Sequence, residues 1–253
     1  MATTSSPRSE RIAHLSSIVA LFMRDHVLSR VSHDLRSPLN AIHSWAYVLE
    51  RKIDAADASA KRAIDGIRTG VEQQVELLEK IVDTTRNETR KLHIESEPFP
   101  ADAMINDAID DARIALADAR GVTLDARGMP CGATIDGDRE RCGQALWLML
   151  VFAVEASARD ATVTLDVGED NGQLRLAASF VAATGALTDD TLAHRLEVFA
   201  RAQAGGPQES GHAAWVLALC QRVAQAHGGR FQAEPLVDGA PVTLTLLLPT
   251  QAN

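Results

Sequence analysis

The chain has 253 residues, of which 46% are hydrophobic and 23% are charged, and this balance is typical of a folded globular protein. Its net charge of −9 argues against general nucleic-acid binding, because such binding needs a basic surface. The three cysteines (Cys131, Cys142 and Cys220) have no metal-ligand spacing, and their odd number argues against a disulfide framework, so we expect a reducing, cytoplasmic location.

The N-terminal segment predicts a short tail followed by a helix. Residues 2–6 are rich in serine and threonine, and we expect residues 1–9 to form a disordered tail. The most apolar stretch that follows, residues 18–23, is too short for a membrane span or for the apolar part of a signal peptide. We therefore expect no membrane segment, no membrane partner and no input domain ahead of the helix.

Apolar residues recur at helical spacing in two long runs. The first extends from Ile12 to Leu49 and contains Pro38, which should kink the helix because proline lacks an N–H group and crowds the preceding turn. The second extends from Ala60 to Val82. Two such helices form a hairpin with one apolar stripe on each member, and two hairpins can bury these stripes in a four-helix bundle. We assign residues 10–90 to this hairpin and expect a homodimer.

The pattern changes from about residue 91, where β-like runs alternate with helical stretches. This alternation predicts an α/β sandwich over residues 91–253, with helices on one face of a mixed sheet. Asp170-Asn171-Gly172, between two β-like runs, predicts a hairpin turn. The predicted helices lie near residues 101–119, 138–157, 189–200 and 212–226, and the predicted strands lie near residues 92–94, 122–124, 161–167, 173–178, 230–233 and 242–248.

Residues with the chemistry of phosphoryl transfer gather around His33 in the first helix. An imidazole can attack a phosphoryl group, and the neighbouring carboxylate of Asp34 can orient the ring and accept its proton. Ser37 shares a helix face with His33 and could position a water molecule. Arg36 could help to neutralise phosphate charge, although a solvated structural role explains it equally well. For phosphoryl transfer, His33 should lie exposed near the middle of its helix.

The segment Ser32-His33-Asp34-Leu35-Arg36-Ser37-Pro38-Leu39 resembles the H-box of two-component sensor histidine kinases, whose usual form is Ser-His-Glu-Leu-Arg-Thr-Pro-Leu. The resemblance extends from residue 10 to Ala226-His227-Gly228-Gly229-Arg230-Phe231. It implies a dimerisation and histidine-phosphotransfer domain followed by a Bergerat-type ATPase domain. In that family the histidine takes the γ-phosphoryl group of ATP and passes it to an aspartate on the receiver domain of a response regulator.

The ATPase half departs from the family pattern at the positions that bind nucleotide and metal. Leucine and phenylalanine stand where the family has two asparagines, and neither side chain can bind a metal ion or donate a hydrogen bond. A carboxylate and most glycines are missing from the two other motifs, which read adenine and approach phosphate. The degenerate positions are Leu148, Phe152, Ala182, Thr184, Ala186, His212, Ala214 and Val216.

These departures predict that the ATPase domain no longer binds ATP and that autokinase activity is absent. The main hypothesis is then a phosphorelay histidine phosphotransferase, in which His33 passes a phosphoryl group between receiver aspartates, with Mg²⁺ supplied by the receiver and no cofactor or metal of its own. Its expected partners are response regulator receiver domains, with an upstream histidine kinase as a further candidate. Three alternatives stay open: a pseudokinase adaptor, a protein that dephosphorylates receivers through Ser37, and an active kinase with an unorthodox ATP site.

Overall fold

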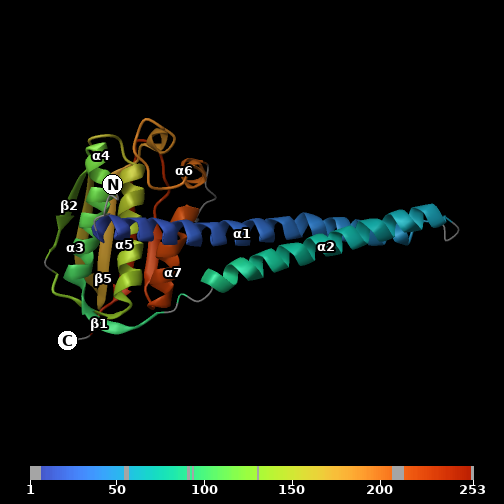
Figure 1. Cartoon of the computed structure of the whole chain (residues 1–253), viewed down its shortest axis with the longest axis horizontal. Helices are drawn as coiled ribbons and strands as arrows, with labels where there is room; N and C mark the ends of the chain where they lie inside the picture. Colours follow the sequence, from blue (N-terminus) through green and yellow to red (C-terminus); the bar gives the residue numbers. More distant parts are fainter. Residues whose placement is uncertain are drawn as a thin grey trace, which may run out of the picture. The chain divides into compact units, whose positions relative to one another are not determined.

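The computed structural model describes residues 7–53, 57–89, 92, 94–129, 131–206 and 214–251. The chain divides into two compact units (Figure 1). The hairpin unit comprises residues 24–91, and the sandwich unit comprises residues 1–23 together with residues 92–253. Among the described residues, no helix is long and apolar enough to cross a membrane.

The hairpin unit contains most of α1 (Pro7–Glu50) and all of α2 (Ala58–Thr89). α1 continues through Pro38, which does not end the helix. Asp57 caps the start of α2, because its carboxylate accepts hydrogen bonds from the backbone N–H groups of Ser59 and Ala60 at 3.1 and 3.0 Å. Several large apolar side chains of the two helices stay exposed within one chain, including Trp45, which is 67% exposed. This pattern agrees with the apolar stripes that the sequence predicts.

The sandwich unit is built on a five-stranded sheet with the order β2-β4-β5-β7-β6. β2 and β4 are parallel, and the other neighbours are antiparallel. A second, two-stranded sheet pairs β1 with β3. The strand bounds are β1 Glu97–Pro100, β2 Thr123–Arg127, β3 Thr134–Gly137, β4 Thr162–Asp170, β5 Gln173–Val181, β6 Arg230–Ala233 and β7 Pro241–Pro249.

Three helices, α3 (Ala101–Ala112), α5 (Arg139–Glu155) and α7 (Ala218–Ala226), lie side by side against the larger sheet (Figure 1). α3 continues through a π-helical turn, Arg113–Ala117, into α4 (Asp118–Arg120). α6 (Val198–Gly205) overlaps only the end of the third predicted helical stretch. Two short 3₁₀ turns, Thr184–Leu187 and Trp215–Leu217, complete the unit. The predicted α/β sandwich is confirmed.

Several local predictions change in the structure. The strand predicted at residues 92–94 is wrong for Leu92 and Ile94, and β1 forms instead at Glu97–Pro100, where it pairs with the unpredicted β3. The predicted helix at 189–200 begins only at Val198. α1 begins at Pro7, so Pro7–Ser9 are helical, while the rest of the expected tail lies outside the described residues.

The predicted hairpin turn is confirmed. Asn171 and Gly172 adopt φ values of 51° and 73° between β4 and β5, as a two-residue hairpin turn requires. At the end of α7, Gly228 has a φ of 71° and Gly229 donates its N–H to the carbonyl of Ala224 at 2.8 Å, which is a helix C-cap. A Cβ at Gly229 would lie 2.0 Å from the carbonyl oxygen of Leu247, so this turn also needs glycine for close packing.

The first turns of α1 belong to the sandwich unit rather than to the hairpin. Arg11 Nη2 lies 2.6 Å from a carboxylate oxygen of the buried Asp111 on α3, and this hydrogen bond raises the pKa of Arg11. The apolar side of the same segment is buried, at Ile12, Leu15, Val19, Phe22 and Met23. The sequence analysis assigned residues 10–23 to the hairpin because one apolar run continues through them. The run itself does not show that its first part belongs to the sandwich unit and the rest to the hairpin unit.

Asp102 ties the start of α3 to the loop before β3, and this contact gives a pH-dependent prediction. Its carboxylate accepts the N–H groups of Cys131 at 2.8 Å and Gly132 at 3.1 Å, and these bonds lower its pKa. Because the pKa of Asp102 is lower in the folded chain, its ionised carboxylate stabilises the fold at pH values above the ordinary pKa of aspartate. This contribution is lost as the pH falls through the folded-state pKa. We expect Asp102→Asn to lower the free energy of unfolding by about 0.5–1 kcal/mol at pH 7, with a difference that narrows below about pH 4. Urea unfolding between pH 7 and pH 2 measures this, and a difference that grows in acid would contradict it.

Candidate functional site

His33 lies near the middle of α1, and its side chain is 84% exposed. Its Nδ1 atom is 3.4 Å from Asp34 Oδ1, while the other carboxylate oxygen of Asp34 is 3.6 Å from Arg30 Nε, one turn earlier. No contact to the other ring nitrogen, Nε2, is found among the described residues. The imidazole is therefore accessible at Nε2 and faces a carboxylate at Nδ1.

The neighbouring candidates Arg36 and Ser37 have different surroundings. Arg36 Nη2 donates to Glu79 Oε1 at 3.0 Å, so its guanidinium group links α1 to α2. The side chain of Ser37 is exposed. The pairing with Glu79 agrees with the structural role left open for Arg36, and sequence reasoning missed Glu79 because helical periodicity does not give the register between two helices.

The two positions that the sequence analysis assigned to the family asparagines lie inside the sandwich unit. Leu148 is 0% exposed and Phe152 is 2% exposed, both on α5. Ala214 and Val216 are buried as well, Ala186 is half-buried, and His212 lies outside the described residues. The side chains of Leu148, Phe152, Ala186, Ala214 and Val216 present no polar atom that could bind a metal ion or a phosphate.

The segment that the sequence analysis assigned to the adenine-reading turn makes several hydrogen bonds within the chain. Ala182 is buried, and its backbone donates to the carbonyl of Ala240 at 2.9 Å and accepts from the N–H of Gly239 at 2.8 Å. Asp238, in the turn between β6 and β7, accepts from the backbone N–H of Thr184 at 2.7 Å and from its hydroxyl at 2.9 Å. These bonds lower the pKa of Asp238. The carboxylate of Asp238 thus faces the segment that the sequence analysis assigned to the adenine-reading turn, a contact that the sequence alone did not indicate.

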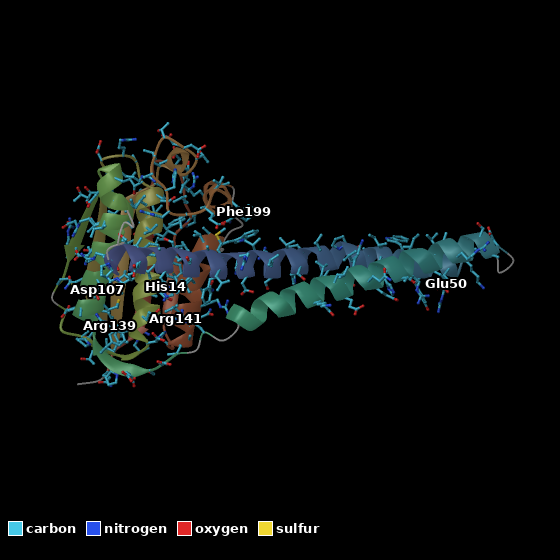
Figure 2. All side chains as sticks on the ribbon, in the orientation of Figure 1. His14, Glu50, Asp107, Arg139, Arg141 and Phe199 are labelled. Atoms are coloured by element: carbon cyan, nitrogen blue, oxygen red, sulfur yellow. The ribbon has the colours of Figure 1, made fainter. Side chains whose placement is uncertain are left out.

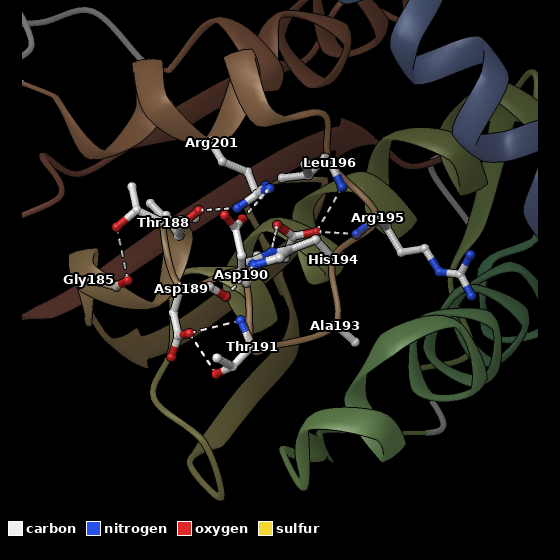
Figure 3. A network of polar contacts seen from close by, with 12 residues as sticks. Gly185, Thr188, Asp189, Asp190, Thr191, Ala193, His194, Arg195, Leu196 and Arg201 are labelled. Atoms are coloured by element: carbon white, nitrogen blue, oxygen red, sulfur yellow. Dashed lines mark hydrogen bonds and ion pairs between the residues drawn. The ribbon is translucent and has the colours of Figure 1, made fainter.

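A buried polar cluster around Glu155, at the end of α5, fixes the segment before α6 (Figure 3). One carboxylate oxygen of Glu155 accepts the N–H groups of Arg195 at 2.6 Å and Leu196 at 2.8 Å. The other lies 2.9 Å from His194 Nδ1, and His194 Nε2 lies 3.0 Å from the carbonyl oxygen of Asp189. A carbonyl oxygen only accepts hydrogen bonds, so His194 donates from Nε2 to Asp189, while its Nδ1 faces the carboxyl group of Glu155.

Two buried arginines complete this cluster. Arg120 donates to the carbonyl oxygens of Ser157 at 3.3 Å and Ala193 at 3.5 Å, and burial lowers its pKa. Arg201 donates to the carbonyl of Leu187 and lies 3.5 Å from Asp190. The side chains of Glu155, His194 and Arg120 thus occupy backbone groups of Asp189, Ala193, Arg195 and Leu196 that a helix would use, and residues 189–197 are not helical. Among the described residues, no group of three or more His, Cys, Asp or Glu side chains is placed to hold a metal ion.

Comparisons with known proteins agree with this arrangement. Residues 23–90 match the His Kinase A (phospho-acceptor) domain family. The chain is 24% identical to the signal transduction histidine-protein kinase BaeS of Escherichia coli over 91% of this chain and 48% of that protein. It is 26% identical to the histidine protein kinase DivJ of Caulobacter vibrioides over 89% of this chain and 37% of that protein. The chain thus spans between about a third and a half of these curated relatives.

A solved structure gives the more extensive match. The histidine kinase from Burkholderia phymatum STM815 is 48% identical, with a TM-score of 0.77 over 96% of this chain and 99% of that chain. A phosphoacceptor hairpin followed by an α/β sandwich defines a two-component signalling module. The chain belongs to the histidine kinase family, with a phosphoacceptor domain and a kinase-like C-terminal domain.

Proposed function

We propose that this two-component, histidine kinase-like protein is a phosphorelay histidine phosphotransferase. In this proposal His33 takes a phosphoryl group from the aspartate of one receiver domain and passes it to another. The observation that carries the proposal is the exposed imidazole of His33, with Nε2 accessible and Nδ1 facing Asp34. The phosphoacceptor family generally implies a homodimer and response regulator partners.

The transfer step uses only groups that the chain and a receiver provide. Nε2 of His33 attacks the phosphorus atom of the aspartyl phosphate, so an N–P bond forms as the P–O bond breaks. The receiver carboxylate leaves with the electron pair of the broken bond. Asp34 stabilises the positive charge that develops on the ring by accepting the Nδ1 proton in a hydrogen bond. Mg²⁺ comes with the receiver, and onward transfer reverses the same step.

The C-terminal domain, in this proposal, binds receivers or regulates the bundle instead of binding ATP. The burial of Leu148 and Phe152 supports this, because ATP with Mg²⁺ needs polar ligands at those places. The contacts of Ala182 and Thr184 within the chain support it further, because their backbone groups already have partners.

A homodimer in a reducing cytoplasm completes the proposal. The exposed apolar side chains of the hairpin, such as Trp45 and Leu77, would be buried in a four-helix bundle formed with a second copy. The cysteines are free thiols, and two of them, Cys142 and Cys220, are buried, with the pKa of Cys142 raised to about 12 by burial. Such thiols fit a reducing compartment.

A second candidate is an active autokinase with an unorthodox ATP site. The names of the relatives favour it over the phosphotransferase, since BaeS, DivJ and the Burkholderia protein are all described as histidine kinases. The apolar residues at the metal- and phosphate-binding positions favour the phosphotransferase. The two differ in the source of the phosphoryl group, which is a receiver in one and ATP in the other.

Transfer from phosphorylated receivers tests the proposal directly. Purified receiver domains from the same genome are charged with a radiolabelled phosphodonor, freed of the donor and mixed with this protein and Mg²⁺. We expect label that is acid-labile and base-stable to move onto the chain from at least one receiver. If every receiver keeps its label, the phosphotransferase is excluded. If label is lost as free phosphate and never appears on the chain, the dephosphorylating alternative is favoured instead.

A further inference from the structure

The two carboxylate oxygens of Asp34 face different side chains of α1. Oδ1 lies 3.4 Å from Nδ1 of His33, and Oδ2 lies 3.6 Å from Nε of Arg30, one turn earlier. All three residues belong to the hairpin unit, and the side chains of Asp34 and Arg30 are 59% and 35% exposed. Arg30 is thus connected to the phosphoacceptor through the carboxylate of Asp34.

The contact between Asp34 and His33 favours the tautomer that phosphoryl transfer needs. A carboxylate accepts a proton donated by Nδ1, and a neutral ring protonated at Nδ1 carries its lone pair on Nε2, the nitrogen that attacks phosphorus. At 3.4 Å the contact is longer than the roughly 2.7–3.2 Å typical of such hydrogen bonds. An exposed aspartate side chain can rotate away from the ring, so a second contact at Oδ2 makes the productive orientation more populated.

The two arginines near this site have different partners. Arg36 donates to Glu79 on α2 at 3.0 Å, so it links the two helices. Arg30 precedes His33 by three residues and Asp34 by four, so the three side chains can meet on one side of α1. An arginine placed four residues before an aspartate is the less stabilising order of such a helix pair, so the pair contributes little to helix stability.

We propose that Arg30 is a positioning residue for phosphoryl transfer, whose guanidinium group holds the carboxylate of Asp34 against Nδ1 of His33. This inference rests on the proposed function, because it concerns the same transfer step. Arg30 takes part in no bond that forms or breaks. It acts by keeping the lone pair on Nε2, while the N–P bond forms and the P–O bond of the aspartyl phosphate breaks as described above.

Nitrogen-15 NMR of the full chain with labelled histidine tests this positioning without a receiver. The chemical shifts of the two ring nitrogens of His33 show which one carries the proton in the neutral imidazole. We expect Arg30→Gln to lower the ratio of rings protonated at Nδ1 to rings protonated at Nε2 by about two- to fivefold, the range that an exposed ion pair supports. An unchanged ratio would overturn the proposal.

Arg68→Gln is the matched control, because Arg68 makes an ion pair of similar exposure away from His33. Its Nη1 atom lies 3.2 Å from Oε2 of Glu50, and the two side chains are 36% and 34% exposed. Figure 2 shows Glu50 near the end of α1, about 25 Å along the helix from His33. Arg68→Gln should therefore leave the ratio unchanged, and a shift equal to that of Arg30→Gln would overturn the proposal.

A double-mutant cycle shows whether Arg30 acts through Asp34. Arg30→Gln should lower kcat for transfer from a phosphorylated receiver by about two- to fivefold and leave the KM for the receiver unchanged. In an Asp34→Asn background the same substitution should change kcat by less than about 1.5-fold. A raised KM would make Arg30 a receiver-docking residue, and equal losses in both backgrounds would give it a role independent of Asp34. Either result would overturn the proposal.

The two measurements separate this inference from the proposed function. If the wild-type chain accepts no label, the phosphotransferase is excluded, while the NMR comparison still decides whether Arg30 orients Asp34. If label is accepted and Arg30→Gln and Arg68→Gln transfer equally fast, the proposed function stands and the role given to Arg30 is wrong.

Discussion

Replacement of His33 by glutamine is expected to abolish acid-labile phosphorylation of this protein, with a loss of at least about 1000-fold in transfer rate, because no other nucleophile lies at this position. Glutamine keeps the helix and has no nucleophilic nitrogen. The side chain of His33 is 84% exposed, so thermal unfolding should be unchanged. The measurement is the rate of label transfer from a phosphorylated receiver to the full chain.

His43→Gln is the matched control for this experiment. His43 lies on the same helix, is half-buried, and is 3.7 Å from Glu72 on α2. Its replacement should leave the transfer rate within about twofold of wild type, since surface substitutions away from a site have small effects. Retention of acid-labile label in His33→Gln, or its loss in His43→Gln, would show that another residue carries the phosphoryl group.

The largest expected effect on stability comes from Glu155→Ala in the cluster of Figure 3. Removal of this buried carboxyl group leaves the N–H groups of Arg195 and Leu196 without their acceptor and the imidazole of His194 without its partner at Nδ1. Breaking a buried pair in this way costs about 3–5 kcal/mol. We expect the free energy of unfolding to fall by that amount in urea denaturation, and residues 189–197 to become sensitive to limited proteolysis.

Glu140→Ala provides the comparison on the same helix. Glu140 is an exposed carboxylate that pairs with Gln144 and lies near His14, so its loss should cost less than about 1 kcal/mol. A cost for Glu155→Ala as small as that of Glu140→Ala would mean that the cluster does not hold the segment before α6. Both residues are glutamates, so a difference in unfolding free energy between the two substitutions measures the effect of burial and not the loss of a charge.

The elements that sequence periodicity predicts well are those whose local signals agree with their packing. The helices at residues 101–119 and 138–157 and the turn at Asn171-Gly172 belong to this group, because an apolar stripe or a turn dipeptide determines each of them locally. Residues 189–197 do not belong to this group, because Glu155, about 40 residues earlier in the chain, accepts hydrogen bonds from their backbone. β3 was missed for a similar reason, since its four residues are fixed by pairing with β1.

The candidate site also contains contacts that are local in sequence, which could be predicted, and contacts between helices, which could not. His33 and Asp34 are adjacent in sequence on one helix, so their proximity could be predicted from the chain alone. The partner of Arg36 could not, since Glu79 lies on the other helix of the hairpin. The boundary within α1, where residues 7–23 join the sandwich unit, depends on ion pairs with α3 that no local pattern encodes.

In the proposed function, the kinase-like domain has lost its ATP chemistry while His33 keeps the phosphoacceptor role. Incubation of the purified chain with Mg²⁺ and γ-labelled ATP, with His33→Gln as the control, tests it most directly. The burial of Leu148 and Phe152 predicts that no acid-labile label appears on the wild-type chain. Label that appears on the wild-type protein and disappears in His33→Gln would show a working autokinase and would contradict the account.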